Sequence, residues 1–356
     1  MMPDRITAHF HEQAGWCRDL GSPFTAQLLI ALARDFKATG ITHGLVSEWS
    51  GNPRRDALGL RLVGALHHAA LNGSAPSLTA VYPAENPGWT MATVWPVVED
   101  YLKTQGQTVR AFLQSAPQTN ETRRCIALLP GFLDLAARFD SPMDLLEIGA
   151  SAGLNQNWDH YAYRTANWQR PGPSDVVIST EWTGPAPAHL AASPTIRSRA
   201  ACDLNPLDIT ADAEALQLKA YVWADQPARL ARLDGAIALA RKTGLRVDKA
   251  DAADWLETQL ASRRPDGLTV IYHSVFLIYP PQETRERIRA LIETAGAAAT
   301  PAAPLAWLCF EPEPLFGGEP ASGMMRTRLQ TWPGGAARFL NQSDGHVTSV
   351  RVLEEA

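Results

Sequence analysis

The chain has 356 residues, of which 46% are hydrophobic and 19% are charged. This composition is typical of an ordered globular protein, and the length favours two domains over one. The formal net charge is −5 and the pI is about 6.0, so the overall charge does not indicate a protein that binds nucleic acid. The four cysteines are widely spaced and form no CxxC pair, which favours reduced thiols over a disulfide framework or a zinc site.

The start of the chain lacks a basic segment followed by an apolar core, and no apolar run has the length of a membrane span. We therefore expect a cytoplasmic protein without a membrane or nucleic acid partner. Its oligomeric state is left open. Histidines lie close together at His9 and His11 and at His67 and His68, but no third ligand stands at a sensible spacing. No metal site is expected.

The first part of the chain, residues 1–140, has a mainly helical pattern. Apolar side chains recur at helical spacing, and breaks rich in Gly and Pro separate the helical runs. The expected helices cover residues 24–33, 57–68, 94–104 and 121–139. We interpret residues 1–140 as an N-terminal helical domain that forms a lid or holds the substrate.

From residue 141, apolar strand-like runs alternate with helical stretches, which predicts βαβ units. The expected strands cover residues 143–148, 196–203, 244–248, 268–273 and 304–310, and the expected helices cover 226–243, 254–262 and 282–294. Two final strands, at 336–340 and 346–352, are joined by a connector that contains Asp-Gly, a hairpin signal. Residues 141–356 are therefore predicted to form an α/β domain with a mostly parallel sheet and a C-terminal antiparallel hairpin.

The segment 145–155 combines a buried strand, a turn of small residues and the start of a helix. Glu147 stands at the strand end, and residues 149–153 have almost no side chain, so a ligand or another backbone can come close. Turns of this kind hold nucleotide-like ligands in α/β domains. The spacing of Gly149 and Gly153 does not meet the Gly-x-Gly-x-x-Gly pattern of NAD-binding domains.

The turn sequence Glu-x-Gly-x-Ser-x-Gly, followed by this strand order, resembles the class I S-adenosylmethionine-dependent methyltransferases. Their first motif is Glu/Asp-x-Gly-x-Gly-x-Gly, and Ser151 replaces the middle glycine. The resemblance implies a Rossmann-like methyltransferase sheet with S-adenosylmethionine as cofactor. It implies that Asp203 holds the ribose hydroxyls and that Asp251 contacts the adenine amino group, although each could instead cap a helix. The cofactor-binding residues expected from it are Glu147, Gly149, Ser151, Gly153, Asn155, Asp203 and Asp251.

The chain as a whole also resembles a bacterial family grouped as domain of unknown function 2332. The segments that carry this resemblance are 119–121, 146–155, 203–208, 223–226 and 273–274. The family implies a methyltransferase-like fold and carries no established reaction, so the methyl acceptor stays open.

The catalytic candidates are His273, Asn120 and Glu121. His273 ends the fourth expected strand, where a neutral imidazole could accept a proton from a substrate, and the alternative is a hydrogen-bonded structural histidine. Asn120 and Glu121 could cover the cofactor cleft, or they could serve only in the first turn of the following helix. The carboxylates of the segment 311–314 are expected to be exposed.

Three functions follow from these patterns. The first is a methyltransferase that acts on an unknown small molecule. The second is a non-catalytic binding or regulatory protein that keeps the fold, because Ser151 departs from the motif and because the Asn/Asp-Pro-Pro-aromatic motif of many methyltransferases is missing. The third and weakest is an NAD-dependent oxidoreductase.

Overall fold

The computed structural model describes residues 3–318 and 323–353 of the chain. The contacts between these residues divide it into two compact units. The first unit consists of Met1–Thr119 and Thr210–Asp234, and the second of Asn120–Ile209 and Gly235–Ala356. No helix among the described residues is long and apolar enough to cross a membrane.

The first unit is helical. The helices expected at 24–33 and 94–104 lie within observed helices, and the one expected at 57–68 begins one residue before the observed helix. Its elements are α1 (Pro3–Asp19), α2 (Pro23–Lys37), α3 (Ile41–Val46), α4 (Leu58–Leu71), α5 (Pro76–Val81), α6 (Met91–Thr104), α7 (Gly106–Leu113), α9 (Asp212–Ala220) and the first part of α10 (Pro227–Thr243).

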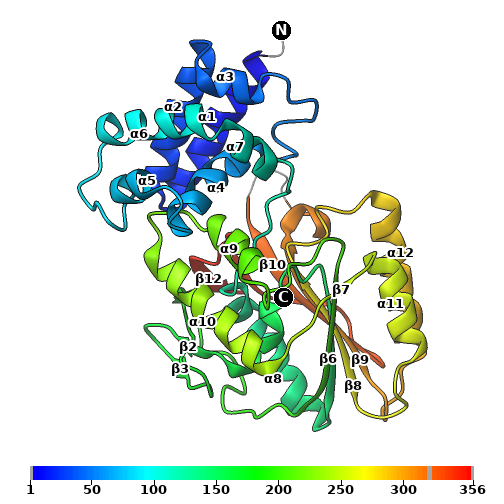
Figure 1. Ribbon diagram of the computed structural model, residues 1–356. Coiled ribbons are helices and arrows are strands. Elements are labelled where there is room, and N and C mark those ends of the chain that lie inside the picture. Colours follow the sequence, from blue (N-terminus) through cyan, green and yellow to red (C-terminus); the bar gives the residue numbers. More distant parts are fainter. Residues whose placement is uncertain (1–2, 319–322, 354–356) are drawn as a thin grey trace. The chain divides into compact units, whose positions relative to one another are not determined.

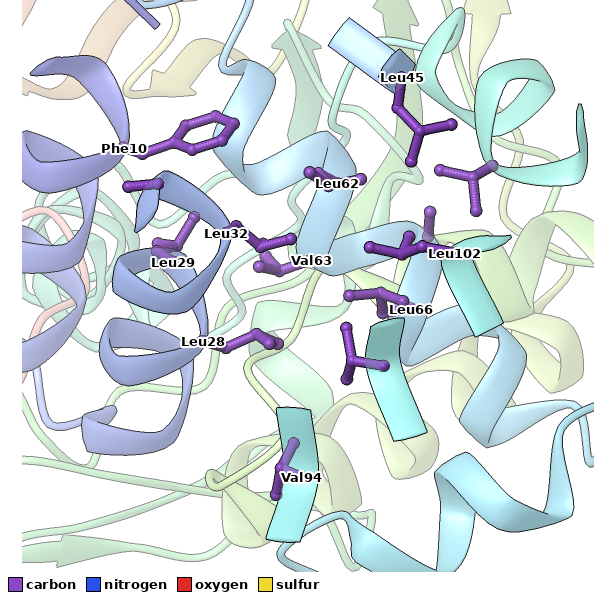
Figure 2. Packing of buried hydrophobic residues seen from close by; sticks show 14 of the residues in the cluster. Phe10, Leu28, Leu29, Leu32, Leu45, Leu62, Val63, Leu66, Val94 and Leu102 are labelled. Carbon is purple, nitrogen blue, oxygen red and sulfur yellow. The ribbon is translucent and has the colours of Figure 1, made fainter. Parts of the chain in front are cut away.

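The core of the first unit forms where the apolar faces of these helices meet, as the helical spacing predicts (Figure 2). Leu29 and Leu32 of α2 pack with Leu62 and Leu66 of α4 in one buried cluster. The segment that follows α9 contributes Trp223 to the same cluster, although it is distant in the sequence.

The second unit is α/β (Figure 1). Its helices are α8 (Arg124–Phe139), the 3-10 helix η1 (Leu154–His160), the rest of α10, α11 (Ala252–Ala261), α12 (Gln282–Ala297) and the 3-10 helix η2 (Glu313–Phe316). Its strands are β1 (Met143–Ile148), β2 (Ala162–Arg164), β3 (Gln169–Arg170), β4 (Val177–Ser179), β5 (Glu181–Thr183), β6 (Ile196–Asp203), β7 (Asp248–Lys249), β8 (Leu268–Ser274), β9 (Leu305–Pro312), β10 (Met325–Trp332), β11 (Arg338–Ser343) and β12 (Ser349–Val352).

The main sheet has nine strands within the described residues, in the order β5-β12-β11-β10-β9-β8-β1-β6-β7. The five strands from β9 to β7 are parallel, and β10, β11 and β12 follow β9 as antiparallel neighbours. Numbered along the chain, the parallel strands have the spatial order 3-2-1-4-5. The prediction of an α/β fold is confirmed, with a sheet that is mixed.

The terminal hairpin is confirmed, because β11 and β12 pair antiparallel. Two other details differ from the expectation. The strand expected at 244–248 is reduced to β7, which pairs with β6 only at Cys202 and Asp203. The strand β10 was not expected, and it lies between the hairpin and β9.

Helices cover both faces of the parallel strands. Side chains alternate across a strand, so Leu146 and Ile148 of β1 share one face with α11 and α12. The opposite face packs against α8, where Phe132 contacts Tyr272 of β8 edge to face at a centroid distance of 5.3 Å. This packing assigns α8 to the second unit, whereas the expected boundary at residue 140 grouped it with the helical domain.

The long interval between β1 and β6 holds a small three-stranded sheet in the order β3-β2-β4. The 3-10 helix η1 ends at His160, and β2 begins at Ala162. Trp158 of this interval stacks on Phe132 at 4.0 Å between ring centroids. This contact packs the interval between β1 and β6 against α8 within the second unit.

Candidate functional site

The topology of the parallel strands indicates where a ligand would bind. The chain moves outward from β1 to β6 and β7 on one side, and then returns to β8 and β9 on the other. In open α/β sheets, ligands bind outside the carboxyl ends of the strands at such a switch point. The loops that follow β1 and β8 therefore frame the candidate site.

The turn after β1 has the backbone shape that its small residues allow. Gly149, Ser151 and Gly153 have positive φ angles of 68°, 55° and 75°. A methyl group on Gly149 would overlap the ring of Phe276, which comes from the loop after β8. Glycine is therefore required there both by the φ angle and by the close approach of Phe276.

Asp203 ties this turn to the end of β6. The backbone N–H of Ser151 donates to Oδ2 of Asp203 at 2.8 Å, and the N–H of Asn205 donates to Oδ1 at 2.9 Å. Each carboxylate oxygen can accept a second hydrogen bond. Asp203 is partly exposed, so it remains able to contact a ligand.

Asn120 reaches the same turn from the other side. The backbone N–H of Leu154 donates to its Oδ1 at 2.9 Å, and Asn120 is buried. The first-turn position expected for Asn120 and Glu121 is wrong, since both lie in the loop before α8, which begins at Arg124. Glu121 is buried too, and its Oε1 accepts from the N–H of Arg123 at 3.0 Å.

Glu147 lies on the α8 face of the sheet and is 3% exposed. The hydroxyl of Tyr272 donates to its Oε2 at 3.1 Å. Burial raises the pKa of Glu147 from 4.5 to about 8, the Tyr272 hydroxyl lowers it, and the charge of Asp203 raises it. Glu147 therefore holds a proton at neutral pH.

Ser151 and Asn155 differ in their partners. The hydroxyl of Ser151 is buried, and it has no hydrogen-bond partner among the described residues. Asn155 is buried in η1, where its Oδ1 accepts from the thiol of Cys125 at 3.3 Å. Ser151 thus presents a buried side-chain oxygen without a hydrogen-bond partner among the described residues at the turn.

Asp251 caps α11. Its Oδ1 accepts from the backbone N–H groups of Ala253 at 2.9 Å and Asp254 at 3.3 Å. The helix-cap interpretation describes the contacts of Asp251 in this structure. For Asp203 the partners are the turn and the following loop, not the first turn of a helix.

His273 does not join the other candidates. It lies on the α12 face of the sheet, opposite Glu147, and is 0% exposed. Its Nδ1 lies 2.6 Å from Oε1 of Glu311, and its Nε2 lies 3.0 Å from Nε1 of Trp307. Both ring nitrogens are occupied, so the ring has the partners of a structural histidine.

Sequence reasoning missed Tyr272, Phe276 and Glu311. The expectation that the carboxylates of segment 311–314 are exposed is wrong, because Glu311 is 0% and Glu313 4% exposed. Glu311 accepts from backbone N–H groups 34 and 35 residues away in the chain. No local pattern reports such partners, although two glutamates directly after an apolar strand were a weak signal.

A family described as an uncharacterized protein conserved in bacteria, domain of unknown function 2332, matches residues 7–351. The chain belongs to this family. No curated protein and no solved structure matches it.

The description of the 2332 family names no reaction, so the chemistry of this member has to be argued from its own residues. Among the residues that the structure describes, no three His, Cys, Asp or Glu side chains form a cluster able to hold a metal ion. What the structure does bring together, at the carboxyl ends of β1 and β6, is the glycine turn, Ser151, Asp203 and Asn120.

Proposed function

We propose that this chain is an S-adenosylmethionine-dependent methyltransferase that acts on a small molecule. The observation that carries the proposal is the hydrogen bond from the Ser151 N–H to Asp203. It joins the small-residue turn after the first parallel strand to the acid that ends the second, at the side of the sheet where α/β domains bind ligands. The strand order 3-2-1-4-5 supports a Rossmann-like methyltransferase fold, which we also propose.

The residues at this edge fit such a cofactor. Asp203 would accept hydrogen bonds from the two ribose hydroxyls with its remaining acceptor positions. The buried hydroxyl of Ser151 would gain the partner that it lacks among the described residues. Asp251 is proposed to approach the base, since both of its capping bonds use Oδ1. When bound, S-adenosylmethionine supplies an electrophilic methyl group on a sulfonium.

The chain's own contribution to methyl transfer would be alignment, which needs little acid–base chemistry. Glu147 is uncharged at neutral pH and keeps the interior beneath the turn free of a buried negative charge. Asn120 holds the N–H of Leu154 and so fixes the far end of the turn. These residues would orient the cofactor without taking part in bond exchange.

The geometry argues against the NAD-dependent alternative. A dinucleotide places its pyrophosphate on free backbone N–H groups at the helix start. Here the N–H of Ser151 is taken by the carboxylate of Asp203 and the N–H of Leu154 by Asn120. A phosphate placed on these two amides would have to displace both side chains and would lie against a carboxylate.

A non-catalytic binding protein is the second candidate. The observation that favours it is the enclosure of His273, because the one expected proton acceptor has no free ring nitrogen. Such a protein would bind S-adenosylmethionine without forming a methylated product.

Isothermal titration calorimetry with S-adenosylmethionine, S-adenosylhomocysteine and NAD tests the proposal. We expect both sulfur ligands to bind and NAD not to bind. Asp203→Ala and Asp203→Asn should weaken binding at least about tenfold, which is about 1.4 kcal/mol. The matched control is Asp266→Ala, an exposed aspartate just before the amino end of β8. Absence of binding by either sulfur ligand in the high-micromolar range would overturn the proposal.

A further inference from the structure

Three buried side chains on the α12 face form a hydrogen-bonded network under the loop that follows β8. Glu311 and His273 are both 0% exposed, and Trp307 is 4% exposed. The carboxylate of Glu311 receives His273 Nδ1 at 2.6 Å, the N–H of Phe276 at 2.8 Å and the N–H of Leu277 at 3.2 Å. A carboxylate with three donors in a dry interior is a strong local anchor.

The chemistry of the indole fixes the role of each atom in this network. The Nε1–H group of Trp307 can only donate, so Nε2 of His273 must accept its hydrogen bond. His273 therefore carries its hydrogen on Nδ1 and donates it to Glu311. The ring is held as one tautomer, with no nitrogen left for a substrate.

The loop anchored by this carboxylate, Val275–Pro281, begins with an unfavourable backbone conformation. Val275 has a φ of 52°, which is rare for a β-branched residue and costs free energy unless the surroundings compensate. Glu311 holds the next two amides, and Phe310 accepts the N–H of Val275 at 2.8 Å. These bonds fix the chain reversal at the end of β8.

The reversal places Phe276 against the glycine turn. Its ring fills the space that a side chain at position 149 would occupy, and it contacts the ring of His273 at 5.8 Å between centroids. The network and the turn after β1 are thus connected through one aromatic side chain. Any displacement of the loop moves the wall that borders the turn.

We propose that Glu311, His273 and Trp307 are positioning residues that set the loop Val275–Pro281, and through Phe276 the wall over Gly149. The hydrogen bonds of Glu311 to the loop are sufficient evidence that the network holds the loop in place. Only the effect of the loop on cofactor binding rests on the proposed function. His273 acts through the loop and not on a substrate. In this way, a network on the face of the sheet opposite Glu147 shapes the proposed cofactor site at the carboxyl ends of β1 and β6.

Amide hydrogen exchange tests the bracing directly. In Glu311→Gln, the NH2 group must replace either Oε1, which accepts from His273 and Phe276, or Oε2, which accepts from Leu277. We therefore expect at least one of the two loop amides to exchange at least about tenfold faster than in the unchanged protein. The matched control is Glu313→Gln, an equally buried glutamate on the same chain segment that bonds Arg326 at 2.7 Å. It should leave these two amides protected. Unchanged exchange in Glu311→Gln would refute the anchor.

A second variant keeps the proposal testable if Glu311→Gln does not fold. Trp307→Phe removes only the indole N–H donor and retains an aromatic ring. In the unchanged protein, 15N NMR at neutral pH should show a protonated Nδ1 and a bare Nε2 on His273. Trp307→Phe should keep the hydrogen on Nδ1 and leave the loop amides protected, because the carboxylate of Glu311 still accepts from Nδ1 and from the two amides. A hydrogen on Nε2 in the unchanged protein would contradict the network.

Calorimetry with S-adenosylhomocysteine connects the network to function. We expect Glu311→Gln to weaken binding at least about fivefold (about 1 kcal/mol) and Glu313→Gln to leave it unchanged. Equal affinities in the two variants would refute the positioning role. If the unchanged protein itself does not bind the ligand, the proposed function fails, whereas the exchange and tautomer measurements still decide whether the network braces the loop.

Discussion

Glu147→Gln should make the second unit more stable, and the gain should grow with pH. Burial raises the pKa of Glu147 from 4.5 to about 8, so the folded chain keeps this proton over a range in which the unfolded chain loses it. The contribution of Glu147 to stability is therefore fully present below about pH 4.5 and is lost as the pH rises to about 8. Glutamine keeps an oxygen for the hydroxyl of Tyr272 and cannot ionise.

The size of the effect follows from the shift in pKa. Each pH unit between the unfolded and the folded pKa changes the free energy of unfolding by about 1.4 kcal/mol. The advantage of Glu147→Gln should therefore reach about 3 kcal/mol at pH 7 and level off near 5 kcal/mol above pH 8, as orders of magnitude. The slope against pH is the decisive quantity, because the intercept includes whatever the amide group gains or loses in contacts.

Urea unfolding between about pH 5 and pH 8 measures this slope, and amide exchange in β1 reports the second unit by itself. The matched control is Glu293→Gln, an exposed glutamate of α12 that should follow the unchanged protein at every pH. Equal pH dependence of the unchanged protein and Glu147→Gln would refute the reasoning, because it would mean that Glu147 titrates alike in the folded and unfolded chains.

Three further predictions concern the turn, a helix cap and the thiols. Gly149→Ala should cost about 1–3 kcal/mol more than Gly244→Ala in urea unfolding, because both glycines have positive φ but only Gly149 faces a ring, that of Phe276. Equal costs would contradict that contact. Asp251→Ala should destabilise the protein by about 1 kcal/mol and Asp251→Ser by much less, since serine also caps helices; thermal unfolding decides between them. The native protein should react slowly with a thiol reagent until urea is added, because burial raises the pKa of every thiol, to about 12 in two of them. Fast labelling of the native protein would contradict this, because it would show an exposed thiolate. These thiols are Cys17, Cys125, Cys202 and Cys309.

The strands β1, β8 and β9 could be predicted from the sequence because they are mostly apolar and are buried along all or nearly all of their length. Met143–Ile148 and Ile196–Asp203 agree with the expected strands at both ends. The strand β10 has no such signal. Every second residue from Thr327 to Thr331 is buried, but two of these buried residues, Thr327 and Thr331, are polar. The strand therefore does not show the alternation of apolar and polar residues that would indicate it in the sequence.

The sequence indicated the glycine turn, whose residues are neighbours in the chain, but not the contacts that join distant segments to it. The glycine turn follows from its small residues, whereas the hydrogen bond between Asn120 and Leu154 joins positions 34 residues apart. His273 stood at the correct strand end, but strand pleating decides which face it occupies, and Trp307 and Glu311 close that face. The expected domain boundary failed to anticipate Thr210–Asp234, because a helix pattern does not reveal which core its apolar residues join.

The segment Thr210–Asp234 belongs to the first unit although it follows part of the second unit in the chain, and this affects the order in which the two units can fold during synthesis. The first 119 residues leave the ribosome without Trp223 of their core, without Tyr221 against Gly64, and without Asp225, whose carboxylate accepts from the N–H of Phe24 at 2.8 Å. The amino-terminal unit therefore completes its core only after β1 and β6 of the other unit have been synthesised. Translation order and folding order are interleaved, and a fragment cut at residue 119 should not be a stable helical domain.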